Sequence, residues 1–105
     1  MISTDKIAVV ILNWNGCEMM RQFLPSVAAH SADEGLVIVA DNGSTDDSLT
    51  MLAQEFPSVV SLKLNENFGF AEGYNQALKQ IDAPYYLLLN LSLIHISEPT
   101  RHAQI

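Results

Sequence analysis

Apolar residues gather into four runs of strand length, separated by segments with helical spacing. The runs span residues 7–12 (IAVVIL), 36–40 (LVIVA), 59–64 (VVSLKL) and 85–89 (YYLLL). The first two are continuous and rich in Val and Ile, which is typical of strands buried on both faces of a parallel sheet. The last run, followed by Asn90, likewise predicts a buried strand that arrives at a functional edge.

Between these runs, apolar residues recur with the three- and four-residue steps of amphipathic helices. The first helix is predicted from Cys17 to about His30, and Pro25 inside it should kink or shorten it. The segment Ser44–Asp47 can cap the second helix. The apolar helix positions are Met20, Phe23, Leu24 and Val27, then Leu49, Leu52, Ala53 and Phe56, then Phe70, Tyr74, Ala77, Leu78 and Ile81. Strand and helix alternate, which predicts a doubly wound α/β sheet.

The composition excludes several classes of protein. Of the 105 residues, 49% are hydrophobic and 16% are charged, which favours a packed core, either one small domain or a piece of a larger one. A formal net charge of −7 disfavours binding to nucleic acid or to an anionic membrane through a basic patch. Cys17 is the only cysteine, the first residues make a poor signal peptide, and no apolar run reaches the length of a membrane span. We therefore expect a cytoplasmic protein.

Each apolar run ends in polar residues: NWNG at 13–16, DNGSTDDS at 41–48, NENFGFAEGYN at 65–75, and Asn90. In a parallel sheet these ends share the carboxyl edge, where open α/β folds bind ligands. Turns and caps would account for any one of these loops. Together they predict a pocket rich in amides and carboxylates.

The signatures of other ligand sites are missing. The dinucleotide motif, the P-loop and a correctly spaced calcium loop are absent, and His30, His95 and His102 lack metal-site spacing. Asp41 is the best single candidate for a ligand contact, because Ser44 is equipped to cap the turn that follows it. Gly73 leaves two interpretations open, namely contact with a ligand or tight packing of a helix on the sheet.

The strings VVILNWNG, IVADNGSTDDS, NENFGFAEGYNQAL and YYLLLN, in this order and at these distances, resemble the N-terminal half of family 2 glycosyltransferases with the GT-A fold. The resemblance extends over residues 6 to 90 and is greatest to enzymes that transfer rhamnose or related sugars in bacterial cell-surface polysaccharide assembly. It implies a Rossmann-like α/β half domain over residues 1–90, truncated after Asn90, with a mostly parallel sheet in the strand order 3-2-1-4.

The resemblance also implies a site. A dTDP- or UDP-linked sugar would bind over the carboxyl edge, and the full-length protein would pass the sugar to a saccharide or lipid-linked acceptor, as a peripheral protein at the inner face of the membrane. Leu12, Asn13 and Asn15 would line the nucleotide pocket, and Asp41, with Asn42 beside it, would reach the base. Near the ribose and diphosphate, or shaping the third loop, would lie Asn67, Gly69, Gly73 and Asn75.

Family members continue from the fourth strand into an acidic motif that holds Mg²⁺ or Mn²⁺, and a later carboxylate acts as the base. Asn90 stands where that motif begins, but Leu91 and Ser92 follow, and Glu98 is the only later acidic side chain. Residues 91–105 resemble translated sequencing-adapter sequence joined to a truncated reading frame. The alternative is a divergent strand extension over residues 91–96. We expect no sugar transfer from these 105 residues alone.

Two other functions stay open. A non-catalytic nucleotide-binding α/β module would have to be a soluble monomer, which an uncovered sheet edge and apolar face disfavour. A flavodoxin-like signalling receiver would need clustered acids after the first strand, where this chain has Asn13, Trp14 and Asn15.

Overall fold

The computed structural model describes residues 2–31 and 35–90, although not the side chains of His30, Ser31 and Asn90. Its central sheet has four parallel strands in the order β4-β3-β2-β6. These are β2 (Ile7–Asn13), β3 (Gly35–Asp41), β4 (Val60–Lys63) and β6 (Tyr85–Asn90). The four expected strands thus form with the expected order. Residues 91–105, on which the predictions for the tail rest, lie outside the described residues.

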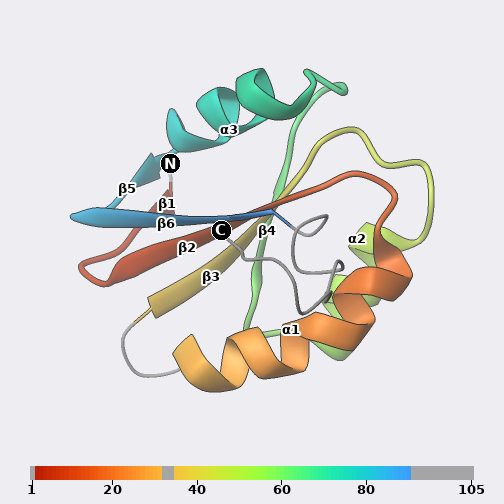
Figure 1. Cartoon of the computed structure of the whole chain (residues 1–105), viewed down its shortest axis with the longest axis horizontal. Helices are drawn as coiled ribbons and strands as arrows, with labels where there is room; N and C mark the ends of the chain where they lie inside the picture. Colours follow the sequence, from red (N-terminus) through yellow and green to blue (C-terminus); the bar gives the residue numbers. More distant parts are fainter. Residues whose placement is uncertain (1, 32–34, 91–105) are drawn as a thin grey trace, which may run out of the picture.

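The sheet lies between two layers of helix (Figure 1). Helices α1 (Cys17–Ser31) and α2 (Ser48–Glu55) cover one face, and α3 (Phe70–Leu78) covers the other. The alternation of side chains along β2 produces this arrangement. Val9 and Ile11 pack with residues of α1 and α2, whereas Ala8, Val10 and Leu12 pack with residues of α3. Both faces of β2 are therefore buried, as its continuous apolar run predicts.

Two short strands, β1 (Ile2–Ser3) and β5 (Ile81–Asp82), were not predicted and form a separate parallel pair. The expected third helix included Ile81, but α3 ends at Leu78 and Ile81 is buried in β5. The first helix is not shortened, because α1 has 15 residues and includes Pro25 in its interior. No helix within residues 2–31 and 35–90 is long and apolar enough to cross a membrane.

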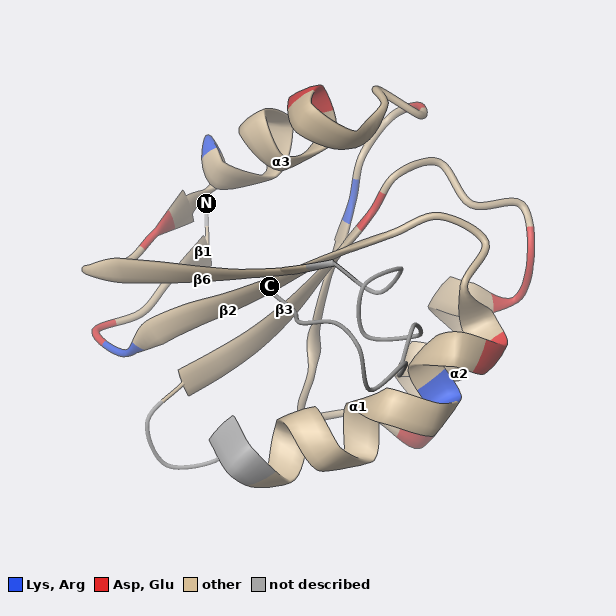
Figure 2. Ribbon diagram, viewed as in Figure 1, with Lys and Arg blue, Asp and Glu red and all other residues tan. Residues whose placement is uncertain are grey.

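An exposed ion-pair network joins the two helices that share a face of the sheet. Arg21 on α1 contacts Glu18 one turn earlier and Glu55 on α2, with 3.0 Å between Arg21 Nη2 and Glu55 Oε2. Figure 2 shows basic and acidic segments near one another where α1 and α2 meet, with further acidic residues on the loops at the same end of the sheet. Exposed ion pairs contribute little to stability, so apolar packing holds α1 and α2 in place.

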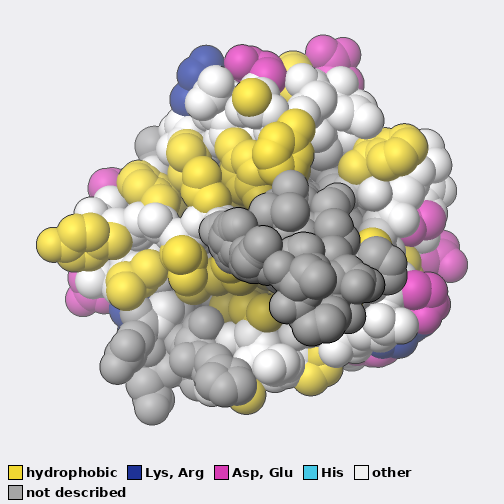
Figure 3. All heavy atoms as spheres, viewed as in Figure 1, with side chains coloured by type: hydrophobic (Ala, Val, Ile, Leu, Met, Phe, Trp, Pro, Cys, Tyr) yellow, Lys and Arg dark blue, Asp and Glu magenta, His cyan; other side chains and the backbone are white. Residues whose placement is uncertain are grey.

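The prediction that the last strand is buried is wrong. Tyr85, Tyr86, Leu87 and Leu88 of β6 are 71%, 42%, 50% and 43% exposed. β6 forms one edge of the described sheet, and the helices cover the central strands β2 and β3 more fully than they cover β6. Figure 3 shows hydrophobic side chains at the surface in this part of the molecule. The residues Tyr85–Leu88 are called the β6 apolar patch below.

Candidate functional site

A cavity of about 350 Å³ opens at the carboxyl edge of the sheet, where the loops after β2, β3 and β4 meet. Six of the ten predicted binding residues line it. The lining residues are Leu12, Asn13, Trp14, Asn15, Gly16, Met19, Asn42, Asn67, Gly69 and Phe70. We call this cavity the carboxyl-edge pocket.

The base of the pocket is a buried hydrogen-bonded pair between adjacent strands. Asn13 and Asp41 are partners in the β2–β3 register, and each is 1% exposed. Asn13 Nδ2 donates to Asp41 Oδ1 at 2.9 Å and to Ser44 Oγ at 3.2 Å, and Asn13 Oδ1 accepts the Gly16 N–H at 3.1 Å. The strong preference of a buried amide and carboxylate for partners fixes both side chains.

Asp41 also organises the turn that follows it. Its Oδ2 accepts the Ser44 N–H at 3.0 Å, so both carboxylate oxygens have partners inside the protein. The expectation that Ser44 would cap this turn in place of Asp41 is therefore wrong. Ser44 Oγ instead accepts the Asn15 N–H at 2.8 Å. Asp41 is not among the residues that line the pocket, and its contact with a base stays a prediction.

Asn15 ties the first loop to the second. It has a φ of 52°, a left-handed conformation that Asn tolerates better than most residues. Its Oδ1 accepts the N–H groups of Thr45 at 2.8 Å and Asp46 at 3.2 Å. Thr45 and Asp46 are thereby held against the first loop, and Asn15 forms part of the pocket wall.

The second helix is capped from within the predicted segment. Asp46 Oδ1 accepts the Ser48 N–H at 2.9 Å, and its Oδ2 accepts the Cys17 N–H at 3.2 Å, so one carboxylate serves the starts of both α2 and α1. Partial burial acts to raise the pKa of Asp46, but the hydrogen bonds from Ser48 and Cys17 outweigh it and lower the pKa. Asp47 takes the N-cap position without a side-chain hydrogen bond.

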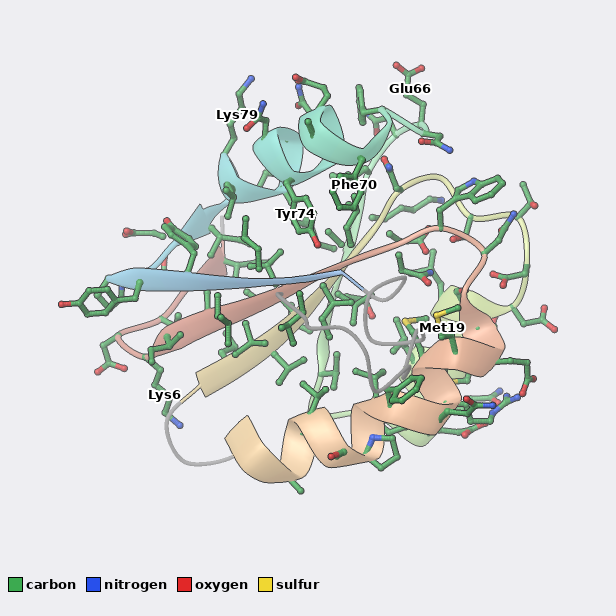
Figure 4. The ribbon with its side chains drawn as sticks, viewed as in Figure 1. Lys6, Met19, Glu66, Phe70, Tyr74 and Lys79 are labelled. Atoms are coloured by element: carbon green, nitrogen blue, oxygen red, sulfur yellow. The ribbon has the colours of Figure 1, made fainter. Side chains whose placement is uncertain are left out.

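The third loop completes the wall opposite the first. Asn67, Gly69 and Phe70 line the pocket from this side. Gly69 has a φ of 82°, which glycine adopts without strain, and a Cβ there would meet nothing within 4 Å. Phe70 begins α3 and packs edge-to-face on Tyr74 with ring centroids 5.3 Å apart (Figure 4). Tyr74 Oη in turn donates to the Leu89 carbonyl at 2.6 Å, which ties α3 to β6.

The remaining predicted residues lie outside the pocket lining. Gly73 packs against the sheet: a Cβ there would lie 2.9 Å from Asn42 Nδ2 and 3.0 Å from Leu12 Cδ2, which supports the packing interpretation. Asn75 is exposed on α3 and its amide lies 3.5 Å from Glu72 Oε1. Asn90 pairs with Leu12 at the end of β6, so its backbone reaches the same edge.

Sequence reasoning missed Trp14, Gly16, Met19 and Phe70 in this pocket. Trp14 and Phe70 are 56% and 55% exposed, although Phe70 was predicted to belong to the apolar face of its helix. The signal available was the position of Trp14 inside a polar loop, where an aromatic residue has no strand or helix to pack on. Figure 4 shows Met19 on α1 and Phe70 on α3 approaching this edge from opposite layers.

The described residues that line the pocket carry no charge. No group of three His, Cys, Asp or Glu side chains within the described ranges is placed to hold a metal ion. Cys17, the first residue of α1, is a weak nucleophile: burial raises the pKa of its thiol despite the opposing effect of Arg21, and nearby carboxylates, Asp46 foremost, raise it further. The pocket therefore suits a neutral, hydrogen-bonding and aromatic group.

Comparison with known sequences gives one family. Residues 8–91 match the family model described as Glycosyl transferase family 2. A Bacillus subtilis (strain 168) relative named "Uncharacterized glycosyltransferase YfnE" is 41% identical over 78 residues, which cover 70% of this chain and 20% of the relative. The N-acetylglucosaminyl-diphospho-decaprenol L-rhamnosyltransferase of Mycobacterium tuberculosis (strain ATCC 25618 / H37Rv) is 30% identical over 78 residues, covering 74% of this chain and 25% of that protein. The chain thus spans a quarter or less of these relatives.

Solved structures agree with the sequence match. The crystal structure of S. aureus TarS 1–349 superposes with a TM-score of 0.69 and 25% identity, covering 82% of this chain and 27% of that one. The mannosyltransferase PcManGT from Pyrobaculum calidifontis, in complex with GDP-Man and Mn²⁺, superposes with a TM-score of 0.58 over 75% of this chain and 26% of its own. At 21% identity the second likeness shows the fold alone. The expected GT-A fold class is confirmed.

Proposed function

Because the chain belongs to glycosyltransferase family 2, we propose that its carboxyl-edge pocket binds the nucleoside end of a nucleoside-diphosphate sugar. The observation that carries the proposal is the convergence of amides and aromatic rings on one uncharged cavity of about 350 Å³. Three loops contribute, and each is fixed by hydrogen bonds to another. Small-molecule sites combine apolar walls with a few fixed polar groups in this way.

The aromatic residues suggest how the base is held. Trp14 is more than half exposed at the pocket, so its indole face is free to receive a planar ring. Stacking of a base on an aromatic side chain contributes about 1–3 kcal/mol, and every base has a face that can take part. Trp14 is therefore the residue on which we propose that the base stacks, with the amides of Asn15 and Asn67 near the polar edge of the base.

The charge of the pocket separates the nucleoside from the diphosphate. No Lys or Arg lines the described part of the cavity, so nothing there balances the charge of two phosphates. The resemblance implies that Mg²⁺ or Mn²⁺ performs this task, yet the described lining also lacks a carboxylate that would hold such an ion. The described residues thus do not fit the metal, and we propose that they bind the nucleoside without it.

The donor and acceptor of the full-length protein are part of the proposal. We propose a UDP- or dTDP-linked donor and a saccharide or lipid-linked acceptor for the full-length protein. The named substrate of the mycobacterial relative, a diphospho-decaprenol-linked sugar, supports the acceptor. We also propose that these 105 residues bind the donor without transferring sugar, since the described pocket offers no carboxylate as a base. Turnover in a sugar-transfer assay with Mn²⁺ would contradict this. The cytoplasmic location stays a prediction.

Titration with UDP and dTDP tests the proposal, because Trp14 is the only tryptophan and reports on the pocket directly. We expect saturable fluorescence quenching by at least one nucleotide, unchanged when EDTA replaces Mn²⁺. In calorimetry, Trp14→Ala should weaken binding about tenfold or more, and Trp14→Tyr should retain most of it. An affinity that does not respond to Trp14→Ala, or no binding by the parent chain, would overturn the assignment.

A further inference from the structure

Asn42 is a buried amide that bonds to a single short segment of the third loop. It follows β3 directly and is 3% exposed. Its Nδ2 donates to Asn67 Oδ1 at 3.2 Å and to the Gly69 carbonyl at 3.0 Å, and its Oδ1 accepts the Phe68 N–H at 3.0 Å. Both amide hydrogens and the carbonyl oxygen of one side chain are therefore used to hold residues 67–69.

The opposite side of this amide is closed by α3. A Cβ at Gly73 would lie 2.9 Å from Asn42 Nδ2, so the helix approaches the amide as closely as a glycine allows. A further hydrogen bond stabilises the loop, because Asn67 Oδ1 also accepts the Gly69 N–H at 2.8 Å. The position of residues 67–69 is thus set by Asn42 between β3 and α3.

Residues 67–69 lead directly into the pocket wall. Asn67, Gly69 and Phe70 line the cavity. Asn42 lines it too, but its polar groups bond to the loop backbone and to Asn67. We infer that Asn42 is a positioning residue, which sets the distance between the third-loop wall and Trp14 and so fits the pocket to a nucleoside. This inference rests on the proposed function, and it replaces the direct ligand contact first expected of Asn42.

The hydrogen bonds that join Asn42 to residues 67–69, called the Asn42 clamp below, require an amide at position 42. Gly69 O and Asn67 Oδ1 are both acceptors towards Asn42, so Asn42→Asp would place a carboxylate oxygen against two other oxygens. The shape is kept but two donors are lost. Burial beside acceptors would raise the pKa of the introduced carboxyl, and its protonated form would regain one donor. The variant should therefore recover as the pH falls.

The titratable groups on the surrounding elements are the same in every variant compared. Asn65→Asp is the matched control, because Asn65 is exposed in the same loop and undergoes the same change of charge. The groups shared by all variants are Asp41 of β3, Lys63 of β4, Glu66 of the loop, and Glu72 and Tyr74 of α3. A difference in pH profile between the two variants then belongs to position 42.

Two readouts test the inference, one without a ligand. In ¹⁵N spectra of Asn42→Asp at about pH 7.5, the amide signals of Phe68 and Gly69 should shift, and these amides should lose protection from exchange. At about pH 5 both properties should return towards the values of the parent chain. Nucleotide affinity should fall about tenfold at the higher pH and recover in parallel. Asn65→Asp should change neither. Gly73→Ala, which displaces the same amide, should disturb the same signals without recovery at low pH.

The outcomes separate this inference from the proposed function. If Asn42→Asp matched Asn65→Asp in spectra and affinity at every pH, the positioning role would be overturned while nucleotide binding stood. Loss of affinity with unshifted Phe68 and Gly69 signals would also overturn it, in favour of direct contact. If the parent chain bound no nucleotide, the proposed function would fail, and unshifted loop signals in Asn42→Asp and Gly73→Ala would still refute the Asn42 clamp. Should Asn42→Asp not fold, Gly73→Ala alone decides.

Discussion

Asn13 and Asp41 face each other across the last rung of the β2–β3 ladder, and Asn13 Nδ2 donates a 2.9 Å hydrogen bond to Asp41 Oδ1. This bond joins the ends of two parallel strands at the point where each strand leaves the sheet. Asn13 also bonds to Gly16 and Asp41 to Ser44, in the loops that line or support the carboxyl-edge pocket. The pocket is therefore built outward from one buried polar pair.

Removing the carboxylate of this pair should destabilise the fold. Asp41→Ala removes one of the two acceptors of the Asn13 amide and the acceptor of the Ser44 N–H, and we expect a loss of about 1–3 kcal/mol in the free energy of unfolding. Urea unfolding measures it. Asp47→Ala is the control, because the side chain of Asp47 makes no capping hydrogen bond and its removal should cost much less. Equal losses in the two variants would contradict the structural role of Asp41.

The sheet core should respond to truncation on the side of α1 and α2. Ile11 is fully buried among residues of β3, α1 and α2, so Ile11→Ala should cost about 2–5 kcal/mol. Ile7 lies on the same strand but is 37% exposed, and Ile7→Ala should cost far less. Chemical unfolding of both variants checks the difference. A similar cost at the two positions would show that β2 is not buried as described.

The sequence predicted the order of the central strands and the two helical layers. The prediction of a strand over residues 7–12 succeeded because a strand buried on both faces must be apolar at successive positions, and that run is visible in the sequence. The prediction that β6 is buried was wrong, although its residues also form an apolar run. An apolar run shows what the side chains are, whereas burial depends on which other elements cover them.

The site was predicted by position but not by role. The strand ends identified Asn13, Asn15 and Asn67 because parallel strands bring their carboxyl ends to one edge. Hydrogen-bond direction is not encoded in residue type, so the sequence could not tell that Asn42 turns its amide to the loop. Nor could it tell that Gly73 makes room for that amide, since both uses of glycine look alike in a sequence.

The β6 apolar patch should cause self-association. Tyr85–Leu88 are all exposed along one edge strand without a charged residue, and such edges pair with other chains. Sedimentation velocity should show oligomers that increase with concentration and decrease in Leu87→Lys. Ser61→Lys adds the same charge on β4, the opposite edge, and should leave association largely unchanged. A parent chain that stays monomeric at all concentrations would refute this prediction.

Asp46 should make stability fall in acid. Hydrogen bonds hold its pKa in the folded state below its ordinary 3.8, so unfolding is accompanied by proton uptake. Its contribution is present in full above the unfolded pKa and is lost as the pH falls through the lower folded pKa. The parent chain should therefore lose more stability below 3.8 than Asp46→Asn, whose side chain does not titrate. Identical acid profiles for the two proteins in thermal unfolding would contradict the cap.

Mapping of a bound nucleotide by NMR tests the central claim most directly. With ¹⁵N-labelled protein and unlabelled UDP or dTDP, saturable shifts should appear at the Trp14 indole N–H and at the amides of Asn15, Asn67 and Phe70. The amides of Lys6, Gly35 and Ser58, which line a smaller cavity at the amino end of the sheet, should stay in place. Shifts confined to that cavity, or none that saturate, would contradict nucleoside binding at the carboxyl edge.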